Sequence, residues 1–405
     1  MNAHENPAGD RTAPDRAEVV VDLDAIAHNV ALTVERVAPA RVWAVVKARA
    51  YGHGDRAVAG AALAAGASGL CVATVDEGER LRDAGIDAPV LLLSQQSPRL
   101  AERVVLARLT PTIHDVAGLD ALVSAGANDH PVHLKVDTGM QRAGVRPDGL
   151  ARLVAALVER SPALRLEGVY THLAVADTLD HPGTEEQLAR FAGALGDLDL
   201  GGVLVHAANS AGALAHPGAR RDLVRLGIAM YGLSPGDDLT AEALGLRPAL
   251  TLRARVAHVK RVEAGSSISY GWRHTFDRAT TVATVPIGYA DGVPRRLSAL
   301  GGEVLIGGRR HPMVGVVTMD QLMVDVGDAA VTVDDEVVLI GSQGDDRIGV
   351  AEWSTRLGTI DYEVVCGISD RVPRRSIGGL NASPLVERRG DPRDRLGGRR
   401  VLPSR

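Results

Sequence analysis

The sequence predicts an α/β protein in which a (β/α)8 barrel, or TIM barrel, is followed by a mostly β C-terminal domain. Between residues 20 and 235, eight short apolar runs alternate with stretches of helical spacing, which is typical of a barrel of parallel strands. After residue 245 the apolar runs are short, and no long helical pattern appears before residue 350, which indicates a β domain. The 405 residues suffice for two or three domains.

Composition excludes several classes of protein. Apolar residues make up 45% and charged residues 23%, as in ordinary globular proteins. The net charge of −5 gives no reason to expect a nucleic-acid partner, and no apolar stretch is long enough to predict a membrane span. Residues 1–18 lack the apolar segment of a secretory signal, and two cysteines are too few for a disulfide scaffold. We therefore expect a cytoplasmic protein, with no metal site.

The elements of the barrel follow one another in order along the chain. The first helix is expected to begin near Asp24, because apolar residues recur at helical spacing after it. Thr74 with Glu77, and Thr184 with Gln187, have the spacing of capping boxes, which predicts the start of a helix at each pair. The eight predicted strands are 42–47, 69–73, 90–93, 109–113, 132–136, 166–172, 203–207 and 223–228.

The second domain is predicted from closely spaced β-type runs. The pair Gly307-Gly308 lies between two of them and predicts a hairpin turn. Its predicted strands lie at 250–259, 281–287, 303–306, 313–317, 322–326 and 336–340. The expected organisation is a flexible arm at 1–17, the barrel at 18–246, the β domain at 247–385 and a disordered basic tail at 386–405.

Reactive side chains follow several of the predicted barrel strands. The C-terminal ends of barrel strands form the working face of such folds, so we expect these side chains to converge there. They are Lys47, Arg142, His172, Ser210 and Arg225, together with the backbone amides around Gly227. A lysine beside a phosphate-binding loop is what a cofactor such as pyridoxal 5'-phosphate (PLP) requires.

Each of these residues also has a purely structural interpretation. Lys47 alone could be a solvated surface lysine, and the two arginines, Arg142 and Arg225, could be ion-pair partners. His172 could be a hydrogen-bonded core histidine. Lys260, one of only three lysines in the chain, lies in an alternating strand of the second domain and is expected to be structural. The functional interpretation depends on the joint placement of the residues at one face.

Taken together, the motifs resemble those of bacterial alanine racemases, PLP-dependent enzymes of fold-type III. The resemblance covers about residues 18–375. It is carried by AVVKARAYGHG at 44–54, HLKVDTGMQRAG at 133–144, GVYTHLAVAD at 168–177, HAANSAGAL at 206–214, VRLGIAMYGL at 224–233, SISYG at 267–271, IGYADGVPR at 287–295, VTMDQ at 317–321 and TIDYEVVCGIS at 359–369.

The resemblance implies a two-base racemase that supplies D-alanine for peptidoglycan. Lys47 matches the lysine that binds PLP and acts as the base on the D-face. Tyr270 matches the opposing base, which reaches the barrel from the second domain of the partner subunit, so the resemblance implies a homodimer with shared active sites. Two bases are needed because the proton leaves one face of the α-carbon and arrives on the other.

The resemblance also assigns roles to the surrounding residues. Arg225 matches the arginine that faces the pyridine nitrogen, and Arg142 one near the cofactor hydroxyl and the substrate carboxylate. Lys135 matches a lysine that is often carbamylated, and His172 a histidine beside the cofactor ring. The implied phosphate-site residues are Tyr51, Ser210, Gly227, Ile228 and Tyr362, and the implied substrate-site and corridor residues are Met319, Asp320 and Tyr289.

Three positions depart from the family pattern. Arg49 and Asp361 stand where Asn is usual, and Gln141 stands where Gly is usual. These departures bear on cofactor affinity and fine specificity, since none of them is assigned to proton transfer. The alternatives are a racemase of broader specificity, acting on serine, lysine or ornithine, and a non-catalytic PLP-binding protein. A fold-related amino-acid decarboxylase is disfavoured, because that enzyme would require an acidic residue at the position of Arg225.

Overall fold

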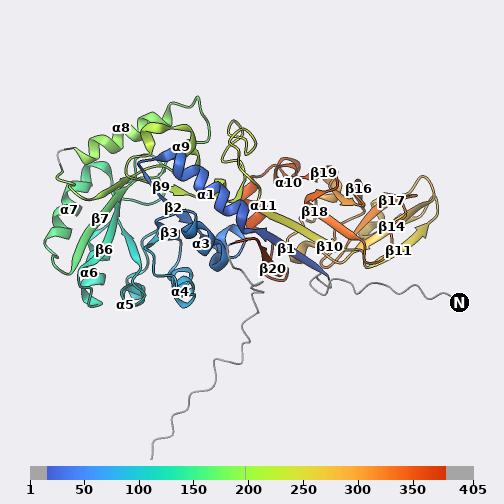
Figure 1. Cartoon of the computed structure of the whole chain (residues 1–405), viewed down its shortest axis with the longest axis horizontal. Helices are drawn as coiled ribbons and strands as arrows, with labels where there is room; N and C mark the ends of the chain where they lie inside the picture. The colour runs from blue at the N-terminus through green and yellow to red at the C-terminus, as the bar shows by residue number, and fades with distance from the viewer. Residues whose placement is uncertain (1–15, 197, 380–405) are drawn as a thin grey trace, which may run out of the picture.

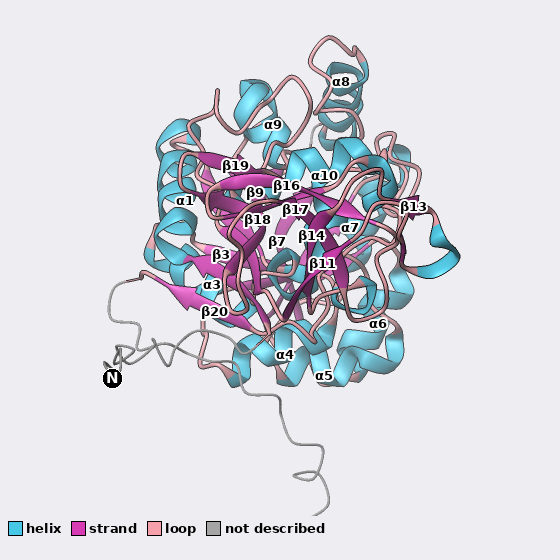
Figure 2. Cartoon of the chain, turned by 90° about the vertical axis from the view of Figure 1, so that its right-hand side faces the viewer, coloured by secondary structure: helices cyan, strands magenta, loops and turns pink. Residues whose placement is uncertain are grey.

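The structure, a computed structural model, describes residues 16–196 and 198–379. The predicted tail at 386–405 and residues 1–15 of the predicted arm lie outside this range. The described chain forms two lobes that lie side by side, a barrel of strands and helices and an elongated β domain (Figure 1). Seen from the end of the β domain, the strands lie at the centre and helices surround them (Figure 2). None of the described helices is long and apolar enough to cross a membrane.

All eight predicted barrel strands are confirmed, and they form one parallel sheet in the order β8-β7-β6-β5-β4-β3-β2-β9. The sheet nearly closes on itself, because the amides of Asp222 and Arg225 donate hydrogen bonds of 3.0 Å to the carbonyls of Val205 and Ala208. The strands are β2 (Arg41–Val45), β3 (Gly69–Val72), β4 (Val90–Leu92), β5 (Thr110–Ile113), β6 (His130–Lys135), β7 (Leu164–Tyr170), β8 (Leu204–His206) and β9 (Leu223–Leu226).

The helices between these strands cover the outside of the barrel. They are α1 (Leu23–Val37), α3 (Asp55–Ala64), α4 (Val75–Asp83), α5 (Ala101–Leu106), α6 (Val116–Ser124), α7 (Leu150–Val158), α8 (Gly183–Leu195) and α9 (Ser210–Ala215). Short 3-10 turns connect elements at η1 (Pro98–Leu100), η2 (Pro147–Gly149), η3 (Pro217–Ala219), η4 (Ile228–Tyr231), η5 (Tyr270–Trp272), η6 (Tyr289–Asp291) and η7 (Ser298–Leu300).

One of the two predicted capping boxes is present. Thr74 accepts a hydrogen bond from the Glu77 amide, and the Glu77 carboxylate accepts from the Thr74 amide, so α4 begins as predicted. The box at Thr184 and Gln187 is wrong, because α8 already begins at Gly183. The Gln187 side chain instead donates to the His172 carbonyl (3.0 Å) and accepts from the Ala174 amide (2.7 Å). It holds the loop after β7, which is a tertiary contact that local spacing does not predict.

The second domain is built on a ten-stranded sheet in the order β11-β14-β17-β16-β15-β18-β10-β1-β20, with β19 paired to β18. The Gly307-Gly308 hairpin is confirmed: both residues have positive φ (59° and 75°), and β15 pairs with β16 on either side of them. The strands from the second half of the chain are β10 (Leu250–Arg255), β11 (His258–Val262), β14 (Thr280–Val285), β15 (Glu303–Ile306), β16 (Arg309–Val314), β17 (Leu322–Gly327), β18 (Glu336–Gln343), β19 (Asp346–Ile348) and β20 (Arg374–Ile377). A separate two-stranded ribbon consists of β12 (Ser267–Ile268) and β13 (His274–Thr275), and two helices follow at α10 (Val350–Leu357) and α11 (Asp361–Cys366).

The N-terminal strand β1 (Ala17–Asp22) belongs to the sheet of the second domain, which differs from the expected boundary of the barrel at residue 18. It lies between β10, with which it pairs antiparallel, and β20, with which it pairs parallel. Five of its six residues are buried. The apolar run Val19–Val21 therefore lies inside this sheet, one strand from its edge, and the other strands of the sheet lie far along the chain. Asp22 then caps α1 by accepting from the amides of Asp24 and Ala25.

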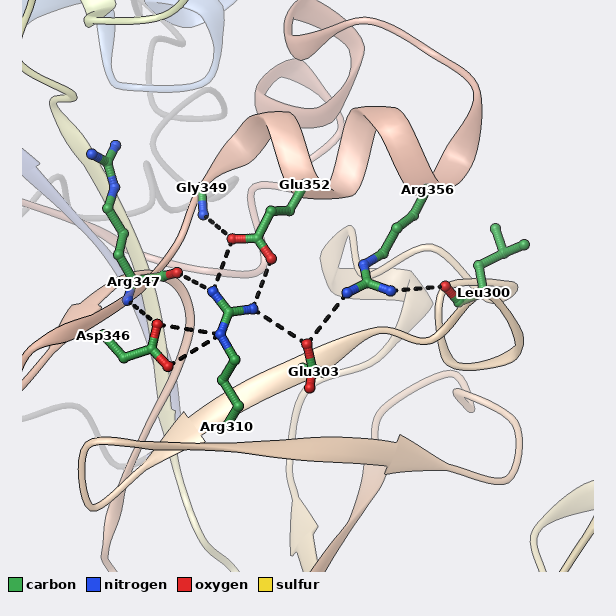
Figure 3. A network of polar contacts seen from close by, with 8 residues as sticks. All are labelled: Leu300, Glu303, Arg310, Asp346, Arg347, Gly349, Glu352 and Arg356. Atoms are coloured by element: carbon green, nitrogen blue, oxygen red, sulfur yellow. Dashed lines mark hydrogen bonds and ion pairs between the residues drawn. The ribbon is translucent and has the colours of Figure 1, made fainter. Parts of the chain in front are cut away.

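Arg310 on β16 joins the β15–β16 hairpin to α10 and β19 (Figure 3). Its guanidinium donates to both carboxylate oxygens of Glu352 (2.8 and 3.1 Å), to Asp346 (3.1 Å) and to Glu303 (3.3 Å). Arg356 approaches Glu303 from the other side (3.3 Å). Hydrogen bonding to Arg310 is the main cause that holds the pKa of Glu352 below its usual value.

We expect Arg310→Met to lower the free energy of unfolding by about 2 kcal/mol, because three carboxylates then lose their shared donor. Since the pKa of Glu352 is lower in the folded state, this stabilisation is present above its unfolded pKa and is lost as the pH falls through the folded pKa. Urea denaturation measures the difference. The neighbouring exposed Arg309 provides the control, and Arg309→Met should change stability by less than about 0.5 kcal/mol. Equal unfolding midpoints for the two variants would contradict this role.

Candidate active site

A cavity of about 420 Å³ opens at the C-terminal ends of the barrel strands. It is lined by ten of the fourteen residues that the sequence singled out, so the structure brings together most of the predicted site. These ten are Lys47, Tyr51, Lys135, Arg142, His172, Ser210, Arg225, Gly227, Ile228 and Tyr362.

Lys47 begins an unusual left-handed turn, α2 (Lys47–Tyr51), directly after β2. Ala48, Arg49, Ala50 and Tyr51 all have φ near +50°, a conformation that costs roughly 1–2 kcal/mol for each residue with a side chain. Glu77 supports this turn, because its carboxylate accepts from the Ala48 amide at 2.7 Å. The capping glutamate of α4 therefore also anchors the lysine loop.

Gly52, directly after this turn, packs closely against the second domain. Gly52 has a φ of +78°, and a Cβ there would lie 2.3 Å from the carbonyl oxygen of Val365 in α11. Only glycine allows this approach. The contact fixes α11, and with it Tyr362, over the rim of the cavity.

Two lysines in the cavity have lowered pKa values. Burial, and then the positive charge of Arg142, lower the pKa of Lys47. Burial, followed by the charges of Arg142 and Arg225, lowers the pKa of Lys135 to about 8. Both amines therefore have a larger neutral fraction near neutral pH than a solvated lysine.

Arg142 is presented by a loop that Asp137 organises. The Asp137 carboxylate accepts hydrogen bonds from the amides of Gly139 (3.0 Å), Gln141 (3.0 Å) and Arg142 (2.9 Å). Gln141 has a φ of 53°, in the region that favours glycine. That conformation explains in physical terms why a glycine suits this position.

Arg225 forms the buried floor of the cavity. Its guanidinium donates to the carbonyls of Thr171 and Ala207 (2.9 Å each) and to Nδ1 of His206 (2.6 Å). It also lies over the Tyr170 ring, 5.0 Å from the centroid, and its contact with Nδ1 of His172 is 3.3 Å. Because these acceptors come from the ends of β7 and β8, the guanidinium is held in one orientation.

Four polar residues inside the barrel were missed by the sequence analysis. His206 contacts His133 (Nε2 to Nδ1, 3.0 Å), and His133 contacts Glu167 (Nε2 to Oε2, 3.3 Å). Tyr170 stacks on His206 with ring centroids 4.6 Å apart. The signal was present in the sequence, since each residue interrupts an otherwise apolar predicted strand (VHLKV, LEGVY and VLVHA). A polar residue inside a barrel strand requires a partner.

The opposite end of the cavity has the features of an anion site. Ser210, at the start of α9, accepts from the Gly227 amide at 2.9 Å. A Cβ at Gly227 would lie 3.0 Å from the Tyr51 hydroxyl, so glycine keeps this end open. The Tyr51 ring packs edge-on against Tyr362 at 5.8 Å. Burial raises the pKa values of both tyrosine hydroxyls, which stay protonated as donors.

The side chains of Arg49 and Asp361, two of the three departures from the family pattern, have partners in the structure. Arg49 forms an ion pair with the exposed Asp370. Asp361 accepts a hydrogen bond from the Ser354 hydroxyl at 2.6 Å, and burial raises its pKa.

Tyr270, Tyr289, Met319 and Asp320 do not line the cavity formed by the described chain. Tyr270 is 70% exposed on the turn between β12 and β13. Ser269 before it has a φ of 65° and a ψ of −176°, an arrangement almost confined to glycine, and its hydroxyl donates to the Val316 carbonyl at 2.8 Å. The turn that presents Tyr270 is thus held in one conformation.

The other three of these residues form a second group on the β domain. The Tyr289 amide donates to the Thr318 carbonyl (2.9 Å), which places Tyr289 beside Met319. Asp320 accepts from Arg371 at 2.6 Å. Tyr289 and Met319 are large side chains that are 42% and 52% exposed.

Comparison with known proteins gives matches along nearly the whole chain. Residues 21–235 match the family model of the alanine racemase N-terminal domain, and residues 249–376 match that of the C-terminal domain. An alanine racemase from Symbiobacterium thermophilum is 49% identical over 373 residues, which cover 90% of this chain and 97% of that protein. Alanine racemase 1 of Bacillus subtilis is 42% identical over 357 residues, which cover 87% and 91%.

Solved structures agree with these matches. The alanine racemase of D-cycloserine-producing Streptomyces lavendulae has a TM-score of 0.85 and 38% identity, over 91% of this chain and 98% of that one. The Bacillus anthracis alanine racemase with bound L-Ala-P has a TM-score of 0.85 and 41% identity, over 92% and 98%. Since both domain models match in order and the matching relatives are covered nearly end to end, the chain belongs to the alanine racemase family.

Proposed function

We propose that this protein uses PLP to interconvert L-alanine and D-alanine. The observation that carries the proposal is the convergence of Lys47, Arg142 and Arg225 in one cavity of a chain that matches alanine racemases over nearly its whole length. D-alanine supply for peptidoglycan is the corresponding physiological role.

The residues of the cavity fit PLP. The open end at Gly227, with the hydroxyls of Ser210 and Tyr51 beside it, suits a phosphate, and Ile228 and Tyr362 complete that end. Lys47 supplies the amine that would bind the cofactor, and His172 would lie beside its ring. When bound, PLP supplies the electron sink that acidifies the α-proton of the substrate.

Two bases on opposite faces would move the proton. Lys47 Nζ holds a proton on one face, and its lowered pKa lets it accept or release that proton near neutral pH. Tyr270 of the partner subunit would act on the other face through its hydroxyl. With L-alanine, the Tyr270 oxygen, deprotonated to the phenolate, would accept the α-proton and become the hydroxyl, while the Lys47 ammonium would deliver a proton to the opposite face. The reverse reaction would use the same groups in reverse.

The two arginines would orient the reaction. Arg225 would face the pyridine nitrogen, and a guanidinium, which does not readily give up a proton, would leave that nitrogen unprotonated. Arg142 would bind the substrate carboxylate. Lys135 is proposed to carry a carbamate, because a lysine with a pKa of about 8 has enough neutral amine to react with carbon dioxide, and the resulting anion would orient Arg142.

The proposed assembly is a cytoplasmic homodimer with shared active sites. Tyr270 lies exposed on a rigid turn away from the cavity of its own chain, as expected of a group that serves another subunit. The exposed Tyr289 and Met319, with Asp320, would form the substrate corridor and the carboxylate contact from the same side. We propose the barrel, from α1 to residue 246, as the PLP-binding unit and the region from 247 onward as the unit that supplies Tyr270.

Chiral chromatography tests the proposed function directly. Purified protein with PLP is incubated with L-alanine and, in parallel, with L-serine, L-lysine and L-ornithine. We expect D-alanine to form fastest and to approach an equal mixture with L-alanine. Faster racemisation of another substrate would point to the broader-specificity alternative, and no enantiomer from any substrate would favour a PLP-binding protein without catalysis.

Gly227→Ala is expected to weaken PLP binding about tenfold, because the added methyl group would lie 3.0 Å from the Tyr51 hydroxyl at the proposed phosphate end. Dialysis against graded PLP concentrations, followed by the absorbance of bound cofactor, measures the change. Gly60→Ala in α3 is the matched control, since nothing lies within 4 Å of a Cβ there. Equal PLP affinity in both variants would place the phosphate elsewhere.

A further inference from the structure

Three hydrogen bonds connect Arg225 to a carboxylate across the inside of the barrel. They run from Arg225 to His206 (2.6 Å), from His206 to His133 (3.0 Å) and from His133 to Glu167 (3.3 Å). Arg225 and both histidines are buried, and the four residues come from β9, β8, β6 and β7. This series of contacts is called the imidazole chain below.

The donor at one end of the imidazole chain and the acceptor at the other end favour the same proton positions along it. A guanidinium only donates, so Nδ1 of His206 must be an acceptor. A neutral His206 then carries its proton on Nε2 and donates to Nδ1 of His133. His133 in turn carries its proton on Nε2 and donates to Glu167, which accepts as a carboxylate. Protonating either imidazole twice would place two donors against each other.

The barrel is shaped to hold these side chains in place. The register between β6 and β7 shifts between Val132 and His133, so that Val132 pairs with Leu166 and His133 with Gly168, and Glu167 is the extra residue. Such a bulge changes the direction in which a side chain points, and here it directs Glu167 toward His133. A Cβ at Gly168 would lie 2.6 Å from the His133 ring, so glycine makes room for that ring. Trp43 stacks on the same ring, with ring centroids 5.5 Å apart.

The charged surroundings of the imidazole chain agree with neutral histidines. Burial lowers the pKa of His133 and lowers that of His206 well below its usual value. The other polar neighbours of Glu167 are Thr110, whose hydroxyl donates to Oε2 at 3.5 Å, and Arg165, which lies 3.7 Å from Oε1. Arg165 therefore faces the carboxylate oxygen that His133 does not use.

We propose that Glu167 is a positioning residue that acts through His133 and His206 to fix the acceptor against which Arg225 is held. The role of Arg225 toward the cofactor rests on the proposed function, whereas the proton positions do not. Removing the acceptor at Glu167 leaves a buried donor on His133 without a partner. This cost offsets the preference that the Arg225 donor imposes from the other end, so both tautomers of His133 become populated.

Nitrogen-15 NMR of the holoenzyme labelled in its histidines tests this proposal. We expect Nδ1 of both His206 and His133 to be unprotonated and both Nε2 atoms to be protonated at neutral pH, with His206 identified through the His206→Gln variant. Protonation of His206 at Nδ1, or double protonation of either ring, would overturn the proposal without any variant of Glu167. The result does not depend on which amino acid the enzyme racemises.

Variants of Glu167 give the second arm of the test. Glu167→Leu should give mixed tautomers at His133 and lower kcat about tenfold with little change in KM. Glu167→Gln keeps an acceptor and should restore the unmodified spectrum, and Arg165→Gln should leave the tautomers unchanged. Two outcomes would overturn the role of Glu167. One is that Glu167→Leu has the same spectrum and kcat as the unmodified enzyme, and the other is that Glu167→Gln behaves like Glu167→Leu. If Glu167→Leu fails to fold, Glu167→Ala, which also removes the acceptor, takes its place in this comparison.

Discussion

Lys47→Ala is expected to lower the rate of racemisation by at least about a thousandfold and to remove the visible absorbance of protein-bound PLP. The amine at this position is proposed both to bind the cofactor and to move the proton on one face. Its lowered pKa, caused by burial and by Arg142, suits that second role. Activity is measured by chiral chromatography in both directions.

Lys260→Ala is the matched control for this variant. Lys260 is an exposed lysine on β11, and it lies outside the residues that line the cavity. Its replacement should leave absorbance and rate unchanged. If Lys47→Ala kept its activity, or if the two lysine variants behaved alike, the assignment of Lys47 would be wrong.

Tyr270→Ala is expected to abolish racemisation while leaving PLP bound, because its side chain is proposed to act on the substrate and the cavity that would hold the cofactor is built without it. Mixing subunits of two inactive variants tests the proposed shared active site more directly. In a dimer with two-fold symmetry, a Lys47→Ala subunit and a Tyr270→Ala subunit together form one complete site. Random mixing of the two inactive proteins should therefore recover about a quarter of the unmodified activity.

Two controls accompany the mixing experiment. Each variant alone, denatured and refolded in the same way, should stay inactive, and native mass spectrometry of differently tagged chains should confirm that mixed dimers form. Confirmed mixed dimers without recovered activity would mean that Tyr270 serves the cavity of its own chain or has no part in catalysis. Trp272 on the same turn, 76% exposed, offers a neighbouring substitution that removes apolar surface but no proposed base.

Most of the barrel could be predicted from sequence because its signals are local. Each strand is a short apolar run, and each run ends close to a residue such as Lys47 or His172 that the fold must present at one face. The same logic placed Arg142 and Arg225 in one cavity. The hairpin at Gly307-Gly308 was also predictable, since both positions need positive φ.

What the sequence could not show depends on contacts between distant segments. The partners of β1 lie more than 200 residues away, so its place in the second sheet has no local signal. Gln187 has the spacing of a capping residue but bonds to the loop after β7. The imidazole chain through His133 and His206 depends on a register shift that becomes visible only when β6 and β7 are paired.

The position of β1 between β10 and β20 has a consequence for how the protein is made. This strand is synthesised before the other described elements, yet its parallel partner β20 is among the last of them to be synthesised. The barrel can form while the chain is still growing, because its strands are nearly consecutive, but the second sheet cannot be completed until synthesis has passed β20. Until then the edge of β1 that pairs with β20 is open, which is the kind of edge that chaperones protect. A fragment that begins at residue 249 lacks this strand, so the C-terminal half of the chain, although it matches a family model of its own, would leave the facing edges of β10 and β20 unpaired.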